Sequence, residues 1–454
     1  MLNFSRIHFI GIGGISMSAL AFLTSEAGVW VSGSDRSNSD TLQKLISYGI
    51  NAYVGSNNSV VAKSDLVVYS SAIGDEDPEL KFARRNKIQC MERKAYLALM
   101  SSECKSVIAI AGSHGKTTTT AMLCHVAERI PLEFIGHVGG IINKEKSNYF
   151  NMGRDYFITE ACEYQRSFLS LTPDIGVLLN SDYDHPDTYP TPQDMNDAFV
   201  QFVEQSRVAV VEENCFKQLR LSAVDNARDK IYTFGFGEDA DFRAVNLTQK
   251  DGKFVFDIQY EGGRVHNVAL ELYGKHNVLN ALAVFAVCYL IWLDGKEVAR
   301  YIGSFSGVDR RFSARGKLKS GAKVIVDYAH HPSEISATVD TVRLMSKGKI
   351  IAVFEPHTYS RTKALLDDFG KCFYWVDELI ILPTYSAREN SEQGLDGSAL
   401  VNFLNTHGEG ALYMETYEDA CDYINSTAKE KDIVLVLGAG SIEKLGDMLV
   451  KKSK

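Results

Sequence analysis

Short apolar strands alternate with helical patterns over most of this chain, and that alternation limits the possible folds more than any other feature. Before residue 100, a strand with a tight turn at 6–14 and strand-like runs at 29–35 and 65–73 are each followed by a helical pattern. Parallel strands need a crossover connection, which is usually a helix, so this order favours a parallel sheet with helices on both faces. The sequence therefore predicts an α/β protein that begins with a doubly wound sheet.

Two more strand-rich sections follow. A strand that begins near Val107 opens the second section, and a third section starts after "GVDRRF" (307–312). Residues 231–273 alternate apolar and polar side chains between glycine turns, which indicates antiparallel strands. The other strand-like runs lie at 155–163, 174–182 and 207–214, and at 323–332, 348–357, 378–386 and 432–441. We therefore predict three domains, at 1–99, 100–309 and 310–454.

Composition argues against several classes of protein. Of the 454 residues, 45% are apolar and 23% are charged, as in an ordinary soluble globular protein. The net charge of −9 argues against a nucleic-acid partner, so an anionic ligand must be met by local groups of Lys, Arg and backbone N–H. The eight cysteines form no CxxC pair, which favours reduced thiols in a cytoplasmic protein and no zinc module.

No pattern in the chain predicts membrane insertion. The longest apolar run, residues 281–293, is too short to cross a bilayer and is better interpreted as a buried core helix. The N-terminus leads directly into a strand and a glycine turn, so no signal peptide is expected.

The stretch "SVIAIAGSHGKTTTTAML" (106–123) has the parts of a phosphate cradle between a strand and a helix. Its glycines let backbone N–H groups turn toward an anion, and the helix N-terminus adds unpaired N–H groups. Lys116 can reach the β- and γ-phosphates, and the Thr117 hydroxyl can bind Mg²⁺. Only two residues separate the glycines, instead of the usual four, and the alternative is an ordinary turn with a solvated lysine. The threonine run suggests hydroxyl contacts to phosphate and metal. The predicted phosphate-binding residues are Gly112, Ser113, His114, Gly115, Lys116, Thr117 and Thr118.

A second glycine turn follows the first strand. Gly11, Gly13 and Gly14 precede a helix, Asp35 closes the next strand, and Ser16 stands where a third glycine is usual. This pattern places a diphosphate at a helix N-terminus and an acid near a ribose or base. Both a nicotinamide dinucleotide and a UDP-sugar satisfy it. Ser70 and Ser71 follow a neighbouring strand and are predicted at the same ligand-binding edge.

Acidic residues end two strands of the second section. Glu160 is predicted to bind Mg²⁺, while Glu163 and Asp187 are predicted to be surface acids. Asp182 and Asp184 precede His185, which is either a second metal ligand or a hydrogen-bonding residue.

The third section places polar side chains directly after buried strands. Tyr328 and His330 follow one strand, and His357 and Arg361 follow the next. An arginine here can bind a carboxylate or phosphate through two parallel hydrogen bonds.

Nine motifs in order resemble the Mur ligase family: "GIGGISMSALA", "GSHGKTTTT", "EACEYQRSFL", "NSDYDHPDTY", "GKHNVLNALA", "GVDRRF", "DYAHHPSEI", "PHTYSRT" and "YSAREN". The resemblance covers nearly the whole chain. It implies a Rossmann-like N-terminal domain that binds a UDP-sugar, a central P-loop-type ATPase, and a Rossmann-like C-terminal domain that helps to bind ATP and the amino acid.

The resemblance also implies an activity, with ATP and Mg²⁺ as cofactors. L-Alanine would be joined to the lactyl carboxylate of UDP-N-acetylmuramate through an acyl phosphate, in the cytoplasm, by a monomer or homodimer. Lys116 and Thr117 would bind ATP and metal, and Glu160 and His185 would hold two magnesium ions. The resemblance places His276, Asn277 and Asn280 at adenine, Arg310 or Arg311 near the nucleotide, and Tyr328, His330, His357 and Arg361 at the alanine and transferred phosphate.

Three positions depart from the family pattern: Ser16, Thr358 where some members have arginine, and Ser441 in "GAGSI". Three alternative functions remain. A recycling ligase would add a tripeptide to the same UDP-sugar. A nicotinamide-dependent dehydrogenase would explain only the first section, and a non-catalytic nucleotide sensor would not need the acids.

Overall fold

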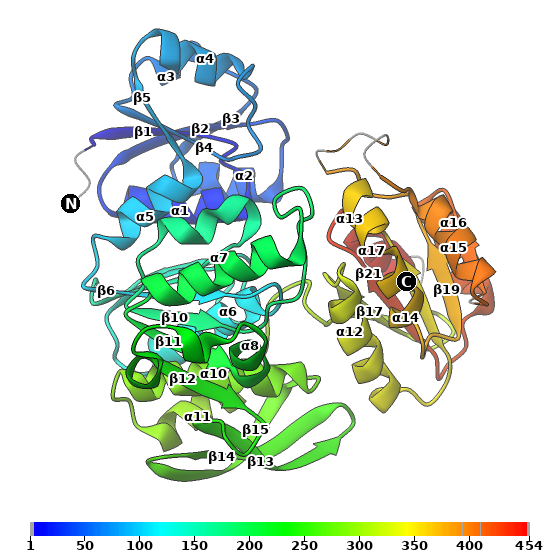
Figure 1. Ribbon diagram of the computed structural model, residues 1–454. Helices are drawn as coiled ribbons and strands as arrows, with labels where there is room; N and C mark the ends of the chain where they lie inside the picture. The colour runs from blue at the N-terminus through cyan, green and yellow to red at the C-terminus, as the bar shows by residue number, and fades with distance from the viewer. Residues whose placement is uncertain (1–3, 388, 390, 392–393, 409, 452–454) are drawn as a thin grey trace. The chain divides into compact units, whose positions relative to one another are not determined.

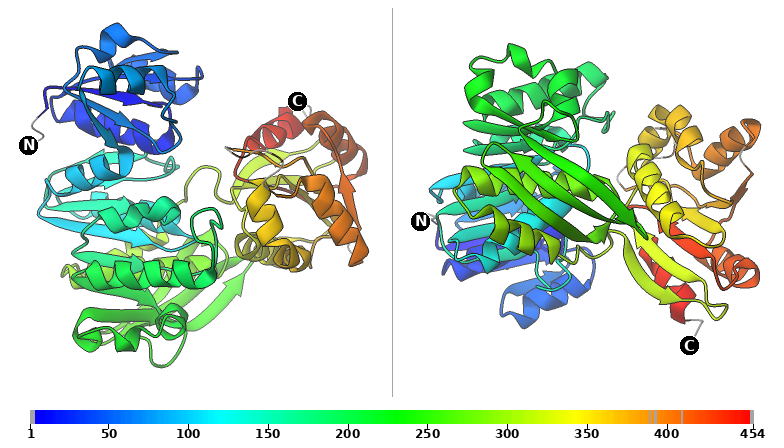
Figure 2. Two further views of the ribbon diagram at one scale, coloured as in Figure 1. Left: turned by 45° about the horizontal axis from the view of Figure 1, so that its top comes forward. Right: turned by 90° about the horizontal axis from the view of Figure 1, so that it is seen from below.

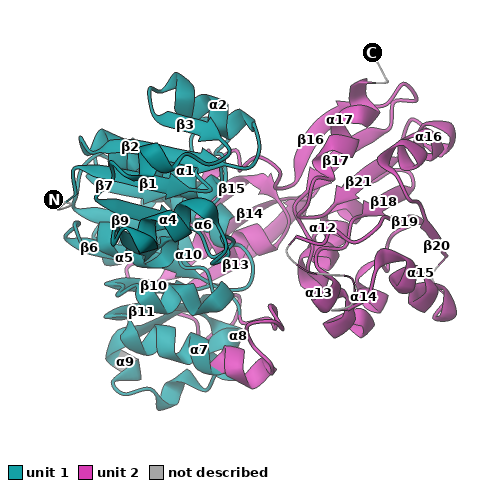
Figure 3. Ribbon diagram, turned by 90° about the horizontal axis from the view of Figure 1, so that it is seen from above, with its two compact units in different colours: residues 1–180, 197–234, 283–302 teal, residues 181–196, 235–282, 303–454 magenta. Residues whose placement is uncertain are grey.

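The computed structural model describes residues 4–387, 389, 391, 394–408 and 410–451, and it contains three sheets (Figure 1). The chain divides into two compact units (Figure 3). Unit 1 comprises residues 1–180, 197–234 and 283–302, and unit 2 comprises residues 181–196, 235–282 and 303–454. Each unit is described by itself.

The first sheet of unit 1 is parallel, with strand order β3-β2-β1-β4-β5. Helices α1, α2 and α5 lie on one face, and α3 and α4 lie on the other (Figure 1). Pro78 starts α4, whose Asp77 cap accepts hydrogen bonds from two N–H groups of the first turn. The elements are β1 (Arg6–Ile10), α1 (Ile15–Glu26), β2 (Trp30–Asp35), α2 (Asp40–Ser47), β3 (Asn51–Val54), α3 (Asn58–Val61), β4 (Leu66–Tyr69), α4 (Pro78–Arg85), β5 (Gln89–Glu92) and α5 (Arg93–Ser101).

The second sheet has ten strands, and its unit 1 strands run in the order β12-β11-β10-β6-β9-β7-β8. Among these pairs only β7 and β8 are antiparallel. The strands are β6 (Ser106–Ala111), β7 (Phe134–His137), β8 (Tyr149–Asn151), β9 (Tyr156–Glu160), β10 (Ile175–Leu178), β11 (Val208–Glu212) and β12 (Ile231–Gly235). The helical segments are α6 (Lys116–Arg129), η1 (Tyr164–Ser170), α7 (Pro192–Gln205), α8 (Glu213–Gln218), η2 (Leu221–Ala223), α9 (Ala227–Lys230), α10 (His276–Leu290) and α11 (Gly295–Gly303).

Two expectations about this region have different outcomes. The antiparallel prediction is wrong for β12, which pairs in parallel with β11 because α8 and α9 provide a crossover between them. The apolar run at 281–293 lies largely in α10, as predicted for a core helix. Among the described residues, no helix is long and apolar enough to span a membrane.

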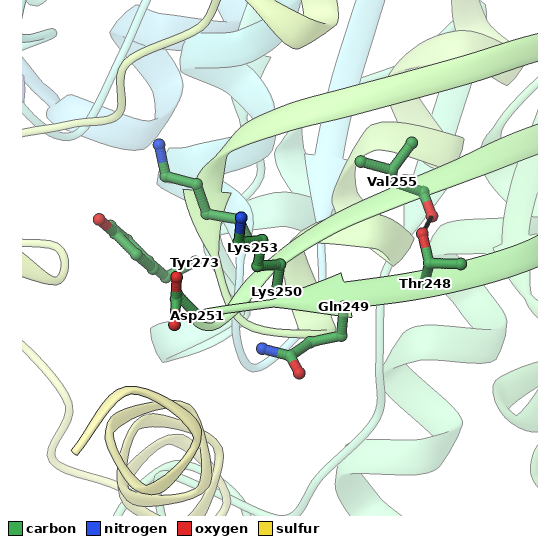
Figure 4. Close-up of a pocket in the computed structure, with 7 residues that line it drawn as sticks. All are labelled: Thr248, Gln249, Lys250, Asp251, Lys253, Val255 and Tyr273. Carbon is green, nitrogen blue, oxygen red and sulfur yellow. Dashed lines mark hydrogen bonds between the residues drawn. The ribbon is translucent and has the colours of Figure 1, made fainter. Parts of the chain in front are cut away.

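The unit 2 strands of the second sheet are long and antiparallel: β13 (Phe242–Lys250), β14 (Lys253–Tyr260) and β15 (Gly263–Tyr273), visible in Figure 2. This confirms the antiparallel prediction for residues 242–273. An open hollow of about 590 Å³ lies beside the β13–β14 turn (Figure 4). Lys253 in its lining pairs with Glu271 at 2.6 Å and lies 5.3 Å from the Tyr273 ring. None of the predicted site residues lines this hollow.

The third sheet lies in unit 2 and has the order β16-β17-β21-β18-β19-β20, in which the strands from β17 to β20 are parallel. Apolar side chains of α12, α14 and α15 cover one face, and those of α16 and α17 cover the other. The elements are β16 (Ser313–Lys317), β17 (Lys323–Asp327), α12 (Pro332–Met345), β18 (Ile350–Phe354), α13 (Tyr359–Ala364), α14 (Leu366–Cys372), β19 (Glu378–Ile381), α15 (Gly397–Thr406), β20 (Ala411–Tyr413), α16 (Tyr417–Thr427), β21 (Ile433–Leu437) and α17 (Glu443–Lys451).

Candidate active site

The glycine turn after β1 is held by backbone and carboxylate contacts. The N–H groups of Gly11 and Ile12 donate to the Ser34 carbonyl at 2.8 and 3.0 Å, and Gly11 has φ +79°. The Gly13 N–H donates to Asp35 Oδ2 at 3.0 Å. A Cβ on Gly13 would lie 2.8 Å from the same oxygen, so only glycine allows this approach. Asp35 therefore shapes the loop, and its predicted contact with a ribose or base stays a prediction.

The two predicted serines lie at the same edge of this sheet. Ser70 follows β4, which pairs directly with β1, and its hydroxyl is 3.9 Å from the position of a Cβ on Gly11. Ser70 Oγ also accepts a hydrogen bond from the Ala72 N–H at 3.3 Å, while Ser71 is half-buried in the same turn. Gly14 caps α1, so the loop leads directly into a helix N-terminus.

The loop after β6 has the backbone conformation of an anion cradle. Gly112 and Gly115 have φ angles of +133° and +83°, which favour glycine. The side-chain amide of Asn180 holds the loop at two points: it accepts from the His114 N–H at 2.8 Å and donates to the His114 carbonyl at 3.0 Å. Asn180 was not among the predicted site residues, although its place just after β10 is where such a side chain can reach the loop.

Lys116, at the start of α6, is folded back onto its own loop. Its Nζ donates to the carbonyls of Gly112 and Ser113 at 2.5 and 3.0 Å and lies 2.7 Å from Glu163 Oε2. Burial is the largest single effect and lowers the pKa of Lys116, but Glu163, Cys162 and Glu160 together outweigh it, so the net shift is upward and Lys116 stays charged. The prediction that Glu163 is a surface acid is wrong, because its side chain is only 2% exposed and forms this ion pair.

Thr117 and Glu160 lie together at the carboxyl edge of the same sheet. The Thr117 hydroxyl donates to Glu160 Oε2 at 3.1 Å, and Glu160 Oε1 accepts from the Gly139 N–H at 2.5 Å. Thr118 is half-buried in the first helical turn. Thr119 and Thr120 are 1% and 0% exposed in the interior, which does not fit phosphate contact for these two threonines.

The residues predicted at adenine lie in unit 2, at the start of α10. Asn280 Nδ2 donates to Asn277 Oδ1 at 2.9 Å, and Asn277 Nδ2 donates to the Tyr273 carbonyl at 2.6 Å. The His276 Nε2 lies 3.0 Å from Asn277 Nδ2. Burial lowers the pKa of His276 to about 4, so the ring is neutral and its Nε2 accepts that hydrogen bond.

The four residues predicted at the amino acid lie side by side in unit 2. The ring centroids of His330 and His357 are 5.6 Å apart, as are those of Tyr328 and His330. Arg361 Nη1 lies 3.0 Å from His357 Nδ1. These side chains follow β17 and β18, which both pair with β21, so their strands end at one edge. Burial lowers the pKa of His330 to about 4 and that of His357 to about 2.

The guanidinium of Arg361 is already bound to a carboxylate. Its Nε donates to Asp184 Oδ1 at 2.8 Å and its Nη2 donates to Asp184 Oδ2 at 3.3 Å, while both side chains are about 5% exposed or less. Arg361 holds the pKa of Asp184 well below its usual range despite burial. His185 follows Asp184 in unit 2, with its Nε2 3.7 Å from Asp184 Oδ2. Asp187 is exposed, as predicted.

Other predicted residues complete this region of unit 2. Arg310 and Arg311 lie over the Tyr328 ring at 5.1 and 4.7 Å, and Arg310 Nη2 donates to the Gly440 carbonyl at 2.8 Å. Thr358 has φ +68°, a strained conformation for a β-branched residue. Ser441 Oγ lies 3.0 Å from the Tyr417 hydroxyl. Arg388 and Asn390 of "YSAREN" lie outside the described residues.

Comparison with known proteins accounts for this combination of sheets and loops. Three family models match in succession: "Mur ligase family, catalytic domain" at 6–104, "Mur ligase middle domain" at 110–288 and "Mur ligase, glutamate ligase domain" at 310–440. The chain belongs to the Mur ligase family. The resemblance in the motifs is thereby confirmed, and the α/β fold with three domains agrees with it.

Relatives within the Mur ligase family extend over the full chain. The chain is 39% identical to the UDP-N-acetylmuramate–L-alanine ligase of Clostridium acetobutylicum, covering 98% of each chain. It is 38% identical to the protein of the same name from Caldanaerobacter subterraneus, covering 100% of this chain and 98% of that one. The crystal structure of UDP-N-acetylmuramate-alanine ligase from Thermotoga maritima matches with a TM-score of 0.82 and 27% identity over 98% of each chain.

The oxygen atoms near the P-loop of this Mur ligase fit a magnesium ion. Thr117 and Glu160 supply a hydroxyl and a carboxylate, which are the hard oxygen ligands that Mg²⁺ prefers. Within the described ranges, no group of three or more His, Cys, Asp or Glu side chains could by itself hold a metal. The predicted second metal ligand, His185, lies in unit 2 beside Asp184.

Proposed function

We propose that this Mur ligase joins L-alanine to the lactyl carboxylate of UDP-N-acetylmuramate, with conversion of ATP to ADP and phosphate, in the cytoplasm. The observation that carries this proposal is the full-length similarity at 38–39% identity to proteins named for that reaction. The alternative ligase that adds a tripeptide has weaker support. The murein peptide ligase from Psychrobacter arcticus matches with a TM-score of 0.72 but only 19% identity, which indicates a shared fold.

A carboxylate resists attack by an amine, so the reaction requires activation. A lactyl carboxylate oxygen attacks the γ-phosphorus and ADP leaves, which gives an acyl phosphate. The alanine amine then attacks the acyl carbon, the tetrahedral intermediate expels phosphate, and the amine loses its proton. We assign Lys116 to the γ-phosphate because its ammonium lies beside the loop carbonyls at the start of α6. Mg²⁺, held by Thr117 and Glu160, would neutralise phosphate charge.

The two histidines in unit 2 carry complementary hydrogen-bonding groups. His330 Nδ1 lies 3.0 Å from the Tyr328 carbonyl, so Nδ1 carries the hydrogen and Nε2 keeps a lone pair. His357 Nδ1 accepts from Arg361, so its hydrogen is on Nε2. Since both rings are neutral near pH 7, we assign His330 to accept the amine proton and His357 to donate to a phosphate oxygen.

A coupled assay tests the proposed function. Phosphate release from ATP is measured with UDP-N-acetylmuramate and, separately, L-alanine, glycine, L-serine and the tripeptide. We expect release to require the UDP-sugar and to be fastest with L-alanine. The alanine methyl contributes only about 1–3 kcal/mol of discrimination, so slower glycine ligation is expected. Fast turnover with the tripeptide, and none with alanine, would establish the recycling reaction instead.

A further inference from the structure

An arginine without an acidic partner lies next to the glycine turn of the first sheet. Arg93 Nη1 donates to Ser16 Oγ at 3.2 Å, in the first turn of α1. Within the described part of the chain, the Arg93 guanidinium makes no other hydrogen bond, and no carboxylate pairs with it. Lys116, by contrast, is already neutralised by Glu163. Arg93 is therefore a cation available to a ligand in unit 1.

The position of Arg93 in its helix costs local stability. Arg93 is the first residue of α5, and Lys94 follows it, so two cations stand at the positive end of the helix dipole. A cation there is unfavourable, because the unpaired N–H groups of the first turn already carry partial positive charge. Lys94 compensates by pairing with Glu92 at 2.9 Å. Arg93 has no such compensation, and a local conflict of this kind is typical of a functional position.

A chain of hydrogen-bonded polar groups, buried beyond Ser16, leads from Arg93 into the interior of unit 1. Ser16 Oγ, which accepts from Arg93, lies 2.9 Å from His137 Nε2. His137 Nδ1 lies 3.0 Å from Thr159 Oγ1, and Thr159 directly precedes Glu160 on β9. His137 is only 3% exposed, and burial lowers its pKa to about 4, with the Arg93 charge acting in the same direction. The ring is therefore a neutral, buried hydrogen-bond partner of the Ser16 hydroxyl.

Arg93 is also close to the P-loop side of unit 1. Burial raises the pKa of the Cys162 thiol to about 11, Glu163 raises it further, and both Lys116 and Arg93 oppose the rise. The two cations thus act on one thiol in the segment between Glu160 and Glu163. In addition, α5 packs against η1, which begins one residue after Glu163. Arg93 therefore contacts the first turn of α1 through Ser16, and its helix packs against the segment that follows Glu163.

We propose that Arg93 binds anionic oxygens of the UDP-sugar, and that Ser16 and His137 position it. This inference rests on the proposed function, because it takes the UDP-sugar as the ligand of the first glycine turn. The oxygens belong either to the diphosphate or to the lactyl carboxylate, and a guanidinium binds both through parallel hydrogen bonds. The serine at position 16 thereby gains a role that glycine could not fill, because glycine has no hydroxyl for Arg93.

Calorimetric titration of the full-length protein tests this assignment. The ligands are UDP-N-acetylmuramate, UDP, uridine and a non-hydrolysable ATP analogue, and the proteins are wild type, Arg93→Met, Arg93→Lys and the control Lys94→Met. We expect Arg93→Met to weaken UDP-N-acetylmuramate binding about tenfold or more, as for loss of a charge-assisted hydrogen bond. Binding of the ATP analogue should change less than threefold, and Lys94→Met should bind all ligands like wild type.

The ligand series identifies the oxygens. Equal weakening for UDP and UDP-N-acetylmuramate, with uridine unchanged, assigns Arg93 to the diphosphate. Weakening for UDP-N-acetylmuramate alone assigns it to the lactyl carboxylate. Unchanged UDP-N-acetylmuramate binding by Arg93→Met overturns the inference and leaves the proposed function intact. Failure of the wild type to bind the UDP-sugar overturns both.

A double-mutant cycle separates positioning from general loss of structure. Ser16→Ala should weaken UDP-N-acetylmuramate binding in the wild type and add little in the Arg93→Met background, because both changes remove one interaction. Arg93→Lys should restore part of the affinity. Additive losses from Ser16→Ala and Arg93→Met would contradict the positioning role.

Discussion

Replacing Glu163 by glutamine keeps the shape of the side chain but removes the charge that neutralises Lys116. In the structure, Glu163 Oε2 lies 2.7 Å from Lys116 Nζ, and the two side chains are 2% and 13% exposed. A nucleotide that recruits Lys116 to its phosphates must first break this ion pair. Glu163→Gln should therefore bind nucleotide more tightly than the wild type.

The size of the effect follows from the contacts that are exchanged. A hydrogen bond to a charged group contributes about 1.5–3 kcal/mol, and a neutral one about 0.5–1.5 kcal/mol. In Glu163→Gln the glutamine can retain a neutral hydrogen bond to Lys116. Separating Lys116 from this side chain therefore costs roughly 1–1.5 kcal/mol less than in the wild type. That difference corresponds to about tenfold in the dissociation constant. The free protein should lose stability in parallel, because Lys116 is left without its counter-charge.

Titration calorimetry with a non-hydrolysable ATP analogue and Mg²⁺ measures this directly. Glu160→Gln is the matched variant, since it lies three residues away and removes an oxygen predicted to bind the metal. We expect a lower dissociation constant for Glu163→Gln and a higher one for Glu160→Gln. If Glu163→Gln weakens binding as much as Glu160→Gln does, Glu163 assists the nucleotide or metal and the reasoning is refuted.

Three more predictions concern other residues of the two units. Asn180→Ala removes both contacts with His114 and should raise the KM for ATP about tenfold, while the KM for alanine stays constant in steady-state kinetics. Arg361→Lys keeps the charge but cannot pair with Asp184 through two parallel hydrogen bonds, so the KM for alanine should rise. A rise confined to the KM for ATP would assign Arg361 to the nucleotide. His137 has a pKa of about 4 in the folded protein, below its unfolded value near 6.5, so between these values the folded protein binds fewer protons than the unfolded chain. The free energy of unfolding therefore falls as the pH drops from about 6.5 to about 4, by up to about 3 kcal/mol. His137→Gln should reduce this loss in denaturant unfolding at pH 7 and pH 5, and an unchanged pH dependence would contradict the assignment.

The fold was predictable wherever a strand is buried on both faces. The central strands β6 and β18 are apolar runs (after Ser106 in β6), β1 is apolar except for Arg6 and His8, and the sequence places all three correctly. Several strands absent from the prediction lie at sheet edges, such as β3 and β20. They are short and partly exposed, so their sequences, "NAYV" and "ALY", lack the apolar pattern of a core strand.

The candidate site was predictable where the chemistry depends on local sequence. The glycine turns, Lys116 and Thr117 are visible because a loop between a strand and a helix fixes their spacing. Contacts between distant residues are not visible in this way. Arg361 and Asp184 are 177 positions apart, and their pairing depends on how unit 2 folds. Arg93 and Asn180 also make their contacts through tertiary packing. Asn180 opens the motif "NSDYDHPDTY", but the motif does not show that its side-chain amide holds the His114 backbone.

The acyl phosphate is the central chemical claim, and oxygen transfer tests it most directly. UDP-N-acetylmuramate labelled with oxygen-18 in the lactyl carboxylate is incubated with ATP, Mg²⁺, L-alanine and the protein, and the released phosphate is analysed by mass spectrometry. The account predicts that each phosphate carries one oxygen from the carboxylate, since that oxygen attacks the γ-phosphorus and leaves with it. Unlabelled phosphate accompanying formation of the alanine product would contradict the account.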